Sequence, residues 1–214
     1  MRILAVDTAL GACSVAILHG DKVLAHSFEV MARGHAEALA PMVEATMKRA
    51  DCEFAGLERL AVTTGPGTFT GQRVGLAFMR AMRIALGIPL VGITTLSAMA
   101  HQAMAETGLA VGVGLHDARR DEVYLEIAGA EQLAPCVLSF DAAMVRLAEL
   151  SGPFALAGTA AERAHDCIPA SALSGVRQPD ALWVAKLART AIASHDPPRP
   201  LYLRPPDAKL PVPR

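Results

Sequence analysis

The chain begins with three short apolar runs separated by polar turns. The runs cover residues 3–6, 13–18 and 23–28, and the turns fall around Gly11 and at residues 19–22. Short apolar runs bounded by turn residues predict β-strands. Three strands joined by short turns should form an antiparallel meander. Its first strand should be central in the sheet, because the first run is apolar on both faces.

A helical pattern follows the meander. Between residues 35 and 50 apolar side chains recur every three or four positions, whereas Glu37, Glu44 and Lys48 form a polar stripe. This pattern predicts an amphipathic helix. Pro41 lies inside it and should bend the helix or limit it to a frayed first turn.

The rest of the chain alternates between short apolar runs typical of strands and apolar positions spaced three or four residues apart, which are typical of helices. This pattern predicts strands at residues 60–64, 90–93, 109–115, 123–127 and 154–157, and helices at 70–86, 96–106, 142–150 and 181–194. The order strand-strand-strand-helix-strand-helix-strand, followed by a shorter echo, indicates two α/β lobes with mixed sheets. We place them at residues 1–107 and 108–196, followed by an extended proline-rich tail at 197–214.

The helix at residues 70–86 is apolar around most of its circumference. Its polar side chains gather in one narrow sector, made of Gln72, Arg73, Arg80 and Arg83. Such a helix must be buried on two sides. Its own sheet covers one side, and the second lobe, the preceding helix or another protein must cover the other.

The loop before this helix, TTGPGTFTGQRV at residues 63–74, resembles a phosphate-binding loop only in its glycines. A Walker loop needs a glycine where Pro66 stands and a lysine where Gln72 stands, and the dinucleotide fingerprint needs a glycine at Thr70. We therefore expect a tight turn in which Thr70 caps the helix by accepting from the backbone of Gln72 or Arg73.

A weak phosphate or nucleotide site remains an alternative for the same region. Helix starts attract anions, and a carboxylate at a strand end suits magnesium. The candidate residues are Asp7, Thr8, Gly65, Gly67 and Thr68. The commoner role of such an aspartate is to form a turn.

Composition narrows the classes of function. The chain has 214 residues, 52% of them hydrophobic and 19% charged, with a net charge of -1. This hydrophobic content is enough for a globular core. The balanced charge provides no basic surface for binding nucleic acid. No two histidines stand three or four residues apart, so we expect no metal site of its own.

The first apolar segment also resembles a signal peptide, with a poor lipoprotein box that ends at Cys13. Asp7 argues against export because a carboxylate inside a short apolar segment is costly to insert. The cysteines stand far apart, at Cys13, Cys52, Cys136 and Cys167. We expect them to be reduced in a cytoplasmic protein that contacts no membrane.

Several blocks resemble the TsaB family in the same order. The most specific block is GPGTFTGQRVGLA at Gly65, which is similar to the family signature GPGSFTGLRIG; the others are ILAVDTALGACSVAIL, RGHAEALAPMVEA, ITTLSAMA, DARRDEVY and LYLRPPDA. This chain departs from the family pattern at three positions. They are Thr68, where serine is usual, Gln72, where leucine is frequent, and His116, which precedes the DAR motif.

The resemblance implies a fold and a function. It implies two RNase H-like lobes of the actin, Hsp70 and sugar kinase superfold with mixed sheets. It also implies a non-catalytic scaffold subunit for threonylcarbamoyl transfer to adenosine next to the tRNA anticodon. Such a subunit activates the catalytic paralogue TsaD together with the ATPase TsaE. It is a homodimer when alone and reaches tRNA only through the complex.

The resemblance further implies which residues take part. The helices at 35–50 and 70–86 would pair with the same helices of TsaD or of a second copy, through Leu39, Met42, Val43, Thr46, Met47, Gln72, Val74, Gly75, Phe78, Met79 and Met82. ATP and magnesium would be used by the complex, with no cofactor of its own. Leu39 follows His35 where TsaD has the second histidine of HxxxH, so no catalytic residue is expected.

Other functions stay open on the sequence alone. A magnesium-nucleotide-dependent phosphotransferase or ATPase of the same superfold would use Asp7 and the Gly65 loop. A peptidase lacks a metal pair and a recognisable triad motif. The tail could be a ligand for a proline-reading domain, although we favour an extended segment that Leu201, Tyr202 and Leu203 hold on the body.

Overall fold

The central strand of the first sheet is the first strand of the chain, as the sequence predicts. The computed structural model describes residues 1–204. The first sheet contains β1 (Arg2–Asp7), β2 (Ala12–His19), β3 (Lys22–Val30), β4 (Arg59–Thr63) and β5 (Leu90–Ile93), in the order β3-β2-β1-β4-β5. The first three strands pair antiparallel, and β1, β4 and β5 pair parallel.

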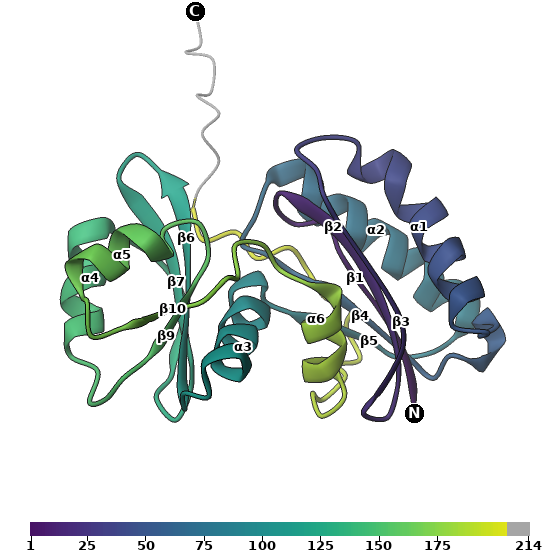
Figure 1. Ribbon diagram of the computed structural model, residues 1–214. Helices are drawn as coiled ribbons and strands as arrows, with labels where there is room; N and C mark the ends of the chain where they lie inside the picture. The colour runs from purple at the N-terminus through teal and green to yellow at the C-terminus, as the bar shows by residue number, and fades with distance from the viewer. Residues whose placement is uncertain (205–214) are drawn as a thin grey trace, which may run out of the picture.

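Two helices cover the outer face of this sheet (Figure 1). They are α1 (His35–Arg49), which runs on through Pro41, and α2 (Phe69–Leu86), which ends at the left-handed Gly87; a short 3-10 turn, η1 (Phe54–Gly56), leads into β4. The predicted cap of α2 is wrong by two residues. Thr68, not Thr70, is the N-cap, and its hydroxyl accepts from the amide of Gly71.

The second lobe repeats this strand order. Its sheet contains β6 (Val111–Arg119), β7 (Glu122–Gly129), β8 (Leu133–Ser139), β9 (Ala155–Ala157) and β10 (Ala172–Leu173), in the order β10-β9-β6-β7-β8. Helices α4 (Phe140–Ala148) and α5 (Ala161–Cys167) cover its outer face. Two lobes with one mixed five-stranded topology confirm the predicted RNase H-like fold class.

Two helices lie between the sheets (Figure 1), α3 (Thr95–Thr107) and α6 (Ala181–Ala188). Helix α3 packs on the second sheet, and α6 packs on the first, where Ala181 and Val184 join the cluster around Ile3 and Ala5. The lobe bounds at 107 and 196 stay a prediction. However, α6, which the predicted second lobe included, packs against the first.

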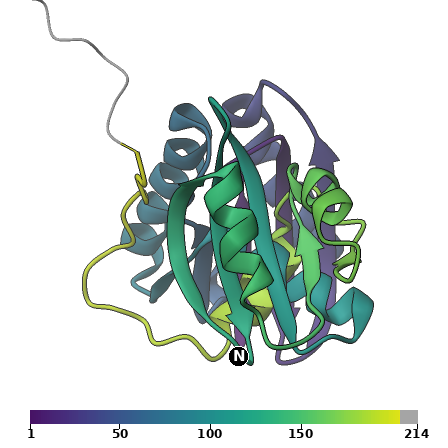
Figure 2. The same ribbon diagram turned by 90° about the vertical axis from the view of Figure 1, so that its left-hand side faces the viewer.

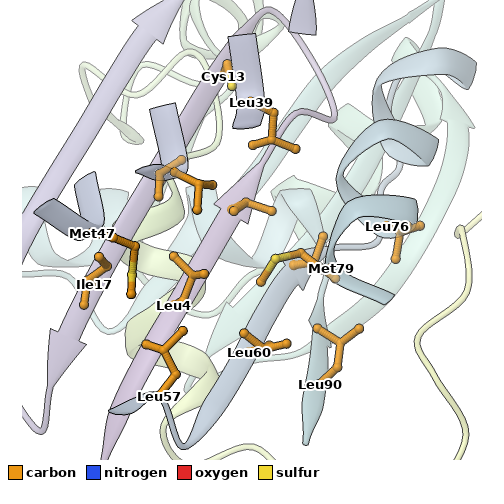
Figure 3. Packing of buried hydrophobic residues seen from close by; sticks show 14 residues of the cluster. Leu4, Cys13, Ile17, Leu39, Met47, Leu57, Leu60, Leu76, Met79 and Leu90 are labelled. Atoms are coloured by element: carbon orange, nitrogen blue, oxygen red, sulfur yellow. The ribbon is translucent and has the colours of Figure 1, made fainter. Parts of the chain in front are cut away.

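The core of the first lobe is formed where α1 and α2 meet the sheet. Figure 3 shows Leu4 and Leu60 of the sheet, Met47 of α1, and Leu76 and Met79 of α2 in one apolar cluster. All five side chains are at most 3% exposed. The most apolar faces of α1 and α2 therefore pack against their own sheet.

Candidate functional site

Asp7 is the last residue of β1 and is fully buried. Its Oδ1 accepts from the Thr63 hydroxyl at 2.6 Å and from the Ala9 amide at 3.2 Å, while Oδ2 has no hydrogen-bond partner. Burial raises the pKa of Asp7 to about 7, although the bonds from Thr63 and Ala9 oppose the shift. A carboxyl that is 0% exposed presents no oxygen to a nucleotide-bound cation in this arrangement.

Thr8 connects β1 to α2. Its hydroxyl donates to the Gly71 carbonyl at 2.7 Å and accepts from the Gly75 amide at 3.0 Å. A Cβ at Gly71 would overlap the Thr8 carbonyl oxygen. The first turn of α2 therefore approaches β1 so closely that only glycine fits.

We expect Gly71→Ala to lower the free energy of unfolding by about 2 to 3 kcal/mol, because an added methyl group forces the backbone apart in a packed site. Chemical denaturation followed by circular dichroism measures this change. Gly152→Ala is the matched control, since nothing lies within 4 Å of a Cβ there. Equal stability of Gly71→Ala and the control would refute the close-approach explanation.

Polar groups of the loop at residues 65–68 form hydrogen bonds with other parts of the same chain. The Thr68 amide donates to the Ala9 carbonyl at 2.8 Å, and the Thr95 hydroxyl donates to the Pro66 carbonyl at 2.6 Å. A Cβ at Gly67 would overlap the Ala9 carbonyl oxygen. The structure thus brings the five candidate phosphate-site residues into one region, but it uses their polar groups for packing the loop on β1.

Gln72, which the sequence groups with the arginines of α2 and assigns to the partner interface, lies beneath this loop. Its side chain is 3% exposed, and its Oε1 has no hydrogen-bond partner. The amide group lies against Gly65, where an added Cβ would overlap it. The periodicity of α2 does not reveal the burial of Gln72, because the loop folds back over the start of the helix.

The predicted interface residues fall into two groups. Those that are buried in the protomer's own core or loop contacts are Leu39, Val43, Thr46, Met47, Gln72, Gly75 and Met79. The half-buried ones are Met42, Val74, Phe78 and Met82, which pack at the edge of the core cluster. The periodic apolar positions mark the face toward the sheet, so only the second group can reach a partner without unfolding.

A different stripe of α2 is open to solvent. Ala77, Ala81 and Ala85 are exposed beside the half-buried Val74 and Phe78, and Ile84 is 82% exposed. Exposed alanines also occur on α1, at Ala36, Ala40 and Ala45. Sequence reasoning missed this surface because an exposed alanine has no signal of its own; the spacing of four residues in α2 could have revealed it.

Other parts of the chain cover most of the remaining surface of α2. The sheet takes Leu76 and Met79, α1 lies beside it, and the segment at residues 195–204 runs along the arginine side. The open alanine stripe, which we call the α2 face, consists of Ala77, Ala81, Ile84 and Ala85. Small side chains on a helix permit close approach of another helix.

Two clefts lie near the start of α2. One, of about 440 Å³, is lined by residues from both helix starts, including Arg33, His35, Thr68 and Val74. The other, of about 470 Å³, lies between the lobes and is lined by Phe69, His116 and Arg204 among others. Burial lowers the pKa of His116 to about 4, so this imidazole is neutral at pH 7.

No helix within residues 1–204 combines the length and the apolar character that a membrane crossing requires. The same residues contain no group of three or more His, Cys, Asp or Glu side chains placed to hold a metal ion.

Comparisons with known proteins agree with one another. The TsaD family model, described as tRNA N6-adenosine threonylcarbamoyltransferase, matches residues 24–169. The chain is 38% identical over 124 residues to the tRNA threonylcarbamoyladenosine biosynthesis protein TsaB of Escherichia coli, covering 58% of this chain and 53% of that protein. It is 30% identical over 124 residues to TsaB of Bacillus subtilis, covering 58% and 53%.

A solved structure extends the likeness over almost the whole chain. YeaZ from Pseudomonas aeruginosa superposes with a TM-score of 0.78 at 27% identity, covering 94% of this chain and 99% of that one. The alignments with the curated relatives, in contrast, span only about half the length of those proteins.

Proposed function

Because the chain belongs to the TsaD family and is a TsaB/YeaZ-like protein within it, we propose that it takes part in the synthesis of threonylcarbamoyladenosine in tRNA as a non-catalytic scaffold. In this role it binds and activates the catalytic subunit TsaD together with the ATPase TsaE. The complex uses ATP and magnesium in the cytoplasm. tRNA is bound through the complex.

The observation that carries the scaffold proposal is the open α2 face. It is apolar, it lies on a helix whose opposite side packs on the sheet, and the half-buried Val74, Phe78 and Met82 border it. Apolar surface that remains open beside a core is typical of a protein interface. A second copy of the chain would occupy the same face in the absence of TsaD.

The hydrogen bonds of the Gly65 loop within its own chain support a scaffold over the nucleotide-enzyme alternative. Asp7 and Thr8 bond within the chain, and the Thr68 amide donates to Ala9 rather than to a ligand. An enzyme of this kind would need these groups to face its nucleotide. A scaffold needs only that they hold α2 in place.

We expect Ala81→Glu to remain folded and to lose its complex with TsaD, because a charge in the centre of an apolar interface must be desolvated without a partner. Light scattering on a sizing column, with this chain alone and mixed with its TsaD counterpart, measures both assemblies. Ala142→Glu on α4 is the matched control, an exposed alanine on the other lobe. A complex that survives in Ala81→Glu would contradict the assignment of the face.

A further inference from the structure

The chain returns across the first lobe after α6. Figure 2 shows this part as the yellow loop along one flank of the molecule. Two arginines of α2 hold its backbone: Arg83 donates to the His195 carbonyl at 2.8 Å, and Arg80 donates to the Pro198 carbonyl at 3.0 Å. We call residues 195–204 the strap.

The strap is also fixed to the edge of the first sheet. The Leu201 amide donates to the Thr64 carbonyl at 2.8 Å, next to the end of β4. A Cβ at Gly92 of the edge strand β5 would come within 2.8 Å of the Pro198 Cβ. The strap therefore covers this edge and approaches the strand closely at Gly92.

An aromatic contact completes the attachment to α2. Arg73 donates to the Tyr202 hydroxyl at 3.0 Å, and its guanidinium lies 3.4 Å from the centre of the Phe69 ring. The Phe69 ring also lines the interlobe cleft. Up to Tyr202 the strap is part of the first lobe.

Two residues later the strap contacts the second lobe. The Arg204 guanidinium donates to the Ala118 carbonyl at 2.9 Å and pairs with the Glu122 carboxylate. Its side chain is 19% exposed. These partners belong to the hairpin between β6 and β7 of the second lobe.

The hairpin turn is shaped to receive this group. Arg119, Arg120 and Asp121 have φ values of 64°, 57° and 57°, a left-handed conformation that residues other than glycine rarely adopt. The turn places a carbonyl and a carboxylate on one side, and the planar guanidinium can donate to both at once. A lysine in its place would supply charge without this fork.

Elsewhere, small side chains form part of the contact between the lobes. Helix α3 contacts the cluster under the first sheet through Ala98, and α6 contributes Ala181, Ala185 and Ala188 to the same cluster. Flat contacts between small residues allow helices to shift against each other. The strap adds a further link between the lobes, from α2 to the β6–β7 hairpin.

We propose that the strap is an interlobe brace and that Arg204 is its clasp. With the clasp closed, the strap joins α2 to the β6–β7 hairpin and fixes the width of the cleft between them. Loss of the clasp releases the second lobe while each lobe stays folded. The proposal is independent of any function in tRNA modification.

Pulsed electron paramagnetic resonance tests the brace on the full chain. Spin labels are placed at Ala45→Cys on α1 and Ala142→Cys on α4, both exposed positions, with Cys52, Cys136 and Cys167 replaced by alanine. The parent is expected to give one narrow distance distribution. Arg204→Ala should give a broader distribution with a shifted mean, and Arg204→Lys an intermediate one.

Arg163→Ala is the matched control. Arg163 pairs at 2.8 Å with Asp121 of the same hairpin, but it lies on α5 within the second lobe. It should leave the distance distribution unchanged. A distribution in Arg204→Ala that equals the parent's, or equal broadening in Arg163→Ala, would overturn the proposal.

Discussion

Asp7→Asn is expected to raise the free energy of unfolding at pH 8 by about 4 kcal/mol and to change it little at pH 4. The effect is large because the buried carboxyl must ionise without a partner for Oδ2. Asparagine resembles the protonated carboxyl in shape, and its oxygen can still accept from Thr63.

The sign follows from proton linkage. The pKa of Asp7 rises from its ordinary value of 3.8 to about 7 in the folded chain. The folded state therefore binds an extra proton between these two pH values, and stability falls as pH rises through this window. In the asparagine variant this loss is absent.

Urea denaturation of parent and variant at several pH values measures the difference. Burial also raises the pKa of Glu126 to about 7 and lowers the pKa of His116 to about 4, so these groups contribute to the parent's own profile, and only the difference between parent and variant isolates Asp7. A difference that is constant from pH 4 to pH 8 would show that Asp7 does not titrate as described.

Met79→Glu is expected to unfold the protein, with a loss of about 5 kcal/mol or more. Met79 is 0% exposed and lies against Leu4 and Leu60 (Figure 3). The substitution removes apolar packing and leaves a carboxyl without a partner in the core. A loss of this size approaches the whole stability of a typical domain.

Circular dichroism and thermal melting of the purified variant measure this loss. Ala81→Glu on the same helix is the control, and it should melt close to the parent because Ala81 is exposed. The pair separates the core side of α2 from the open α2 face. A folded Met79→Glu protein would contradict the packing described for α2.

The order of elements could be predicted because each apolar run has a clear period. The strand at 90–93 agrees residue for residue with β5, and the central place of β1 follows from its two apolar faces. Four elements were missed, the short 3-10 turn η1 among them. Strand β8 is half exposed and contains Pro135, α5 has seven residues, and β10 has two, so none has an apolar pattern long and regular enough to be recognised.

The candidate site was harder to predict, for a physical reason. Periodicity shows that α2 is apolar on several sides, but it does not show which side the sheet takes. Met79 was therefore expected at the interface and lies in the core, whereas the exposed Ala81 was not considered. The strap's route along α2 also depends on Arg80 and Arg83 meeting carbonyls more than 110 residues away, which no local pattern encodes.

The most direct test of the scaffold account is a reconstituted modification assay. TsaD, TsaE, unmodified tRNA, ATP, magnesium and the threonylcarbamoyl donor are combined with and without this chain, and threonylcarbamoyladenosine is quantified by mass spectrometry. The account predicts that product forms with the parent chain and with Ala142→Glu, and that it is lost without the chain or with Ala81→Glu. Equal product in the absence of the chain would contradict the account.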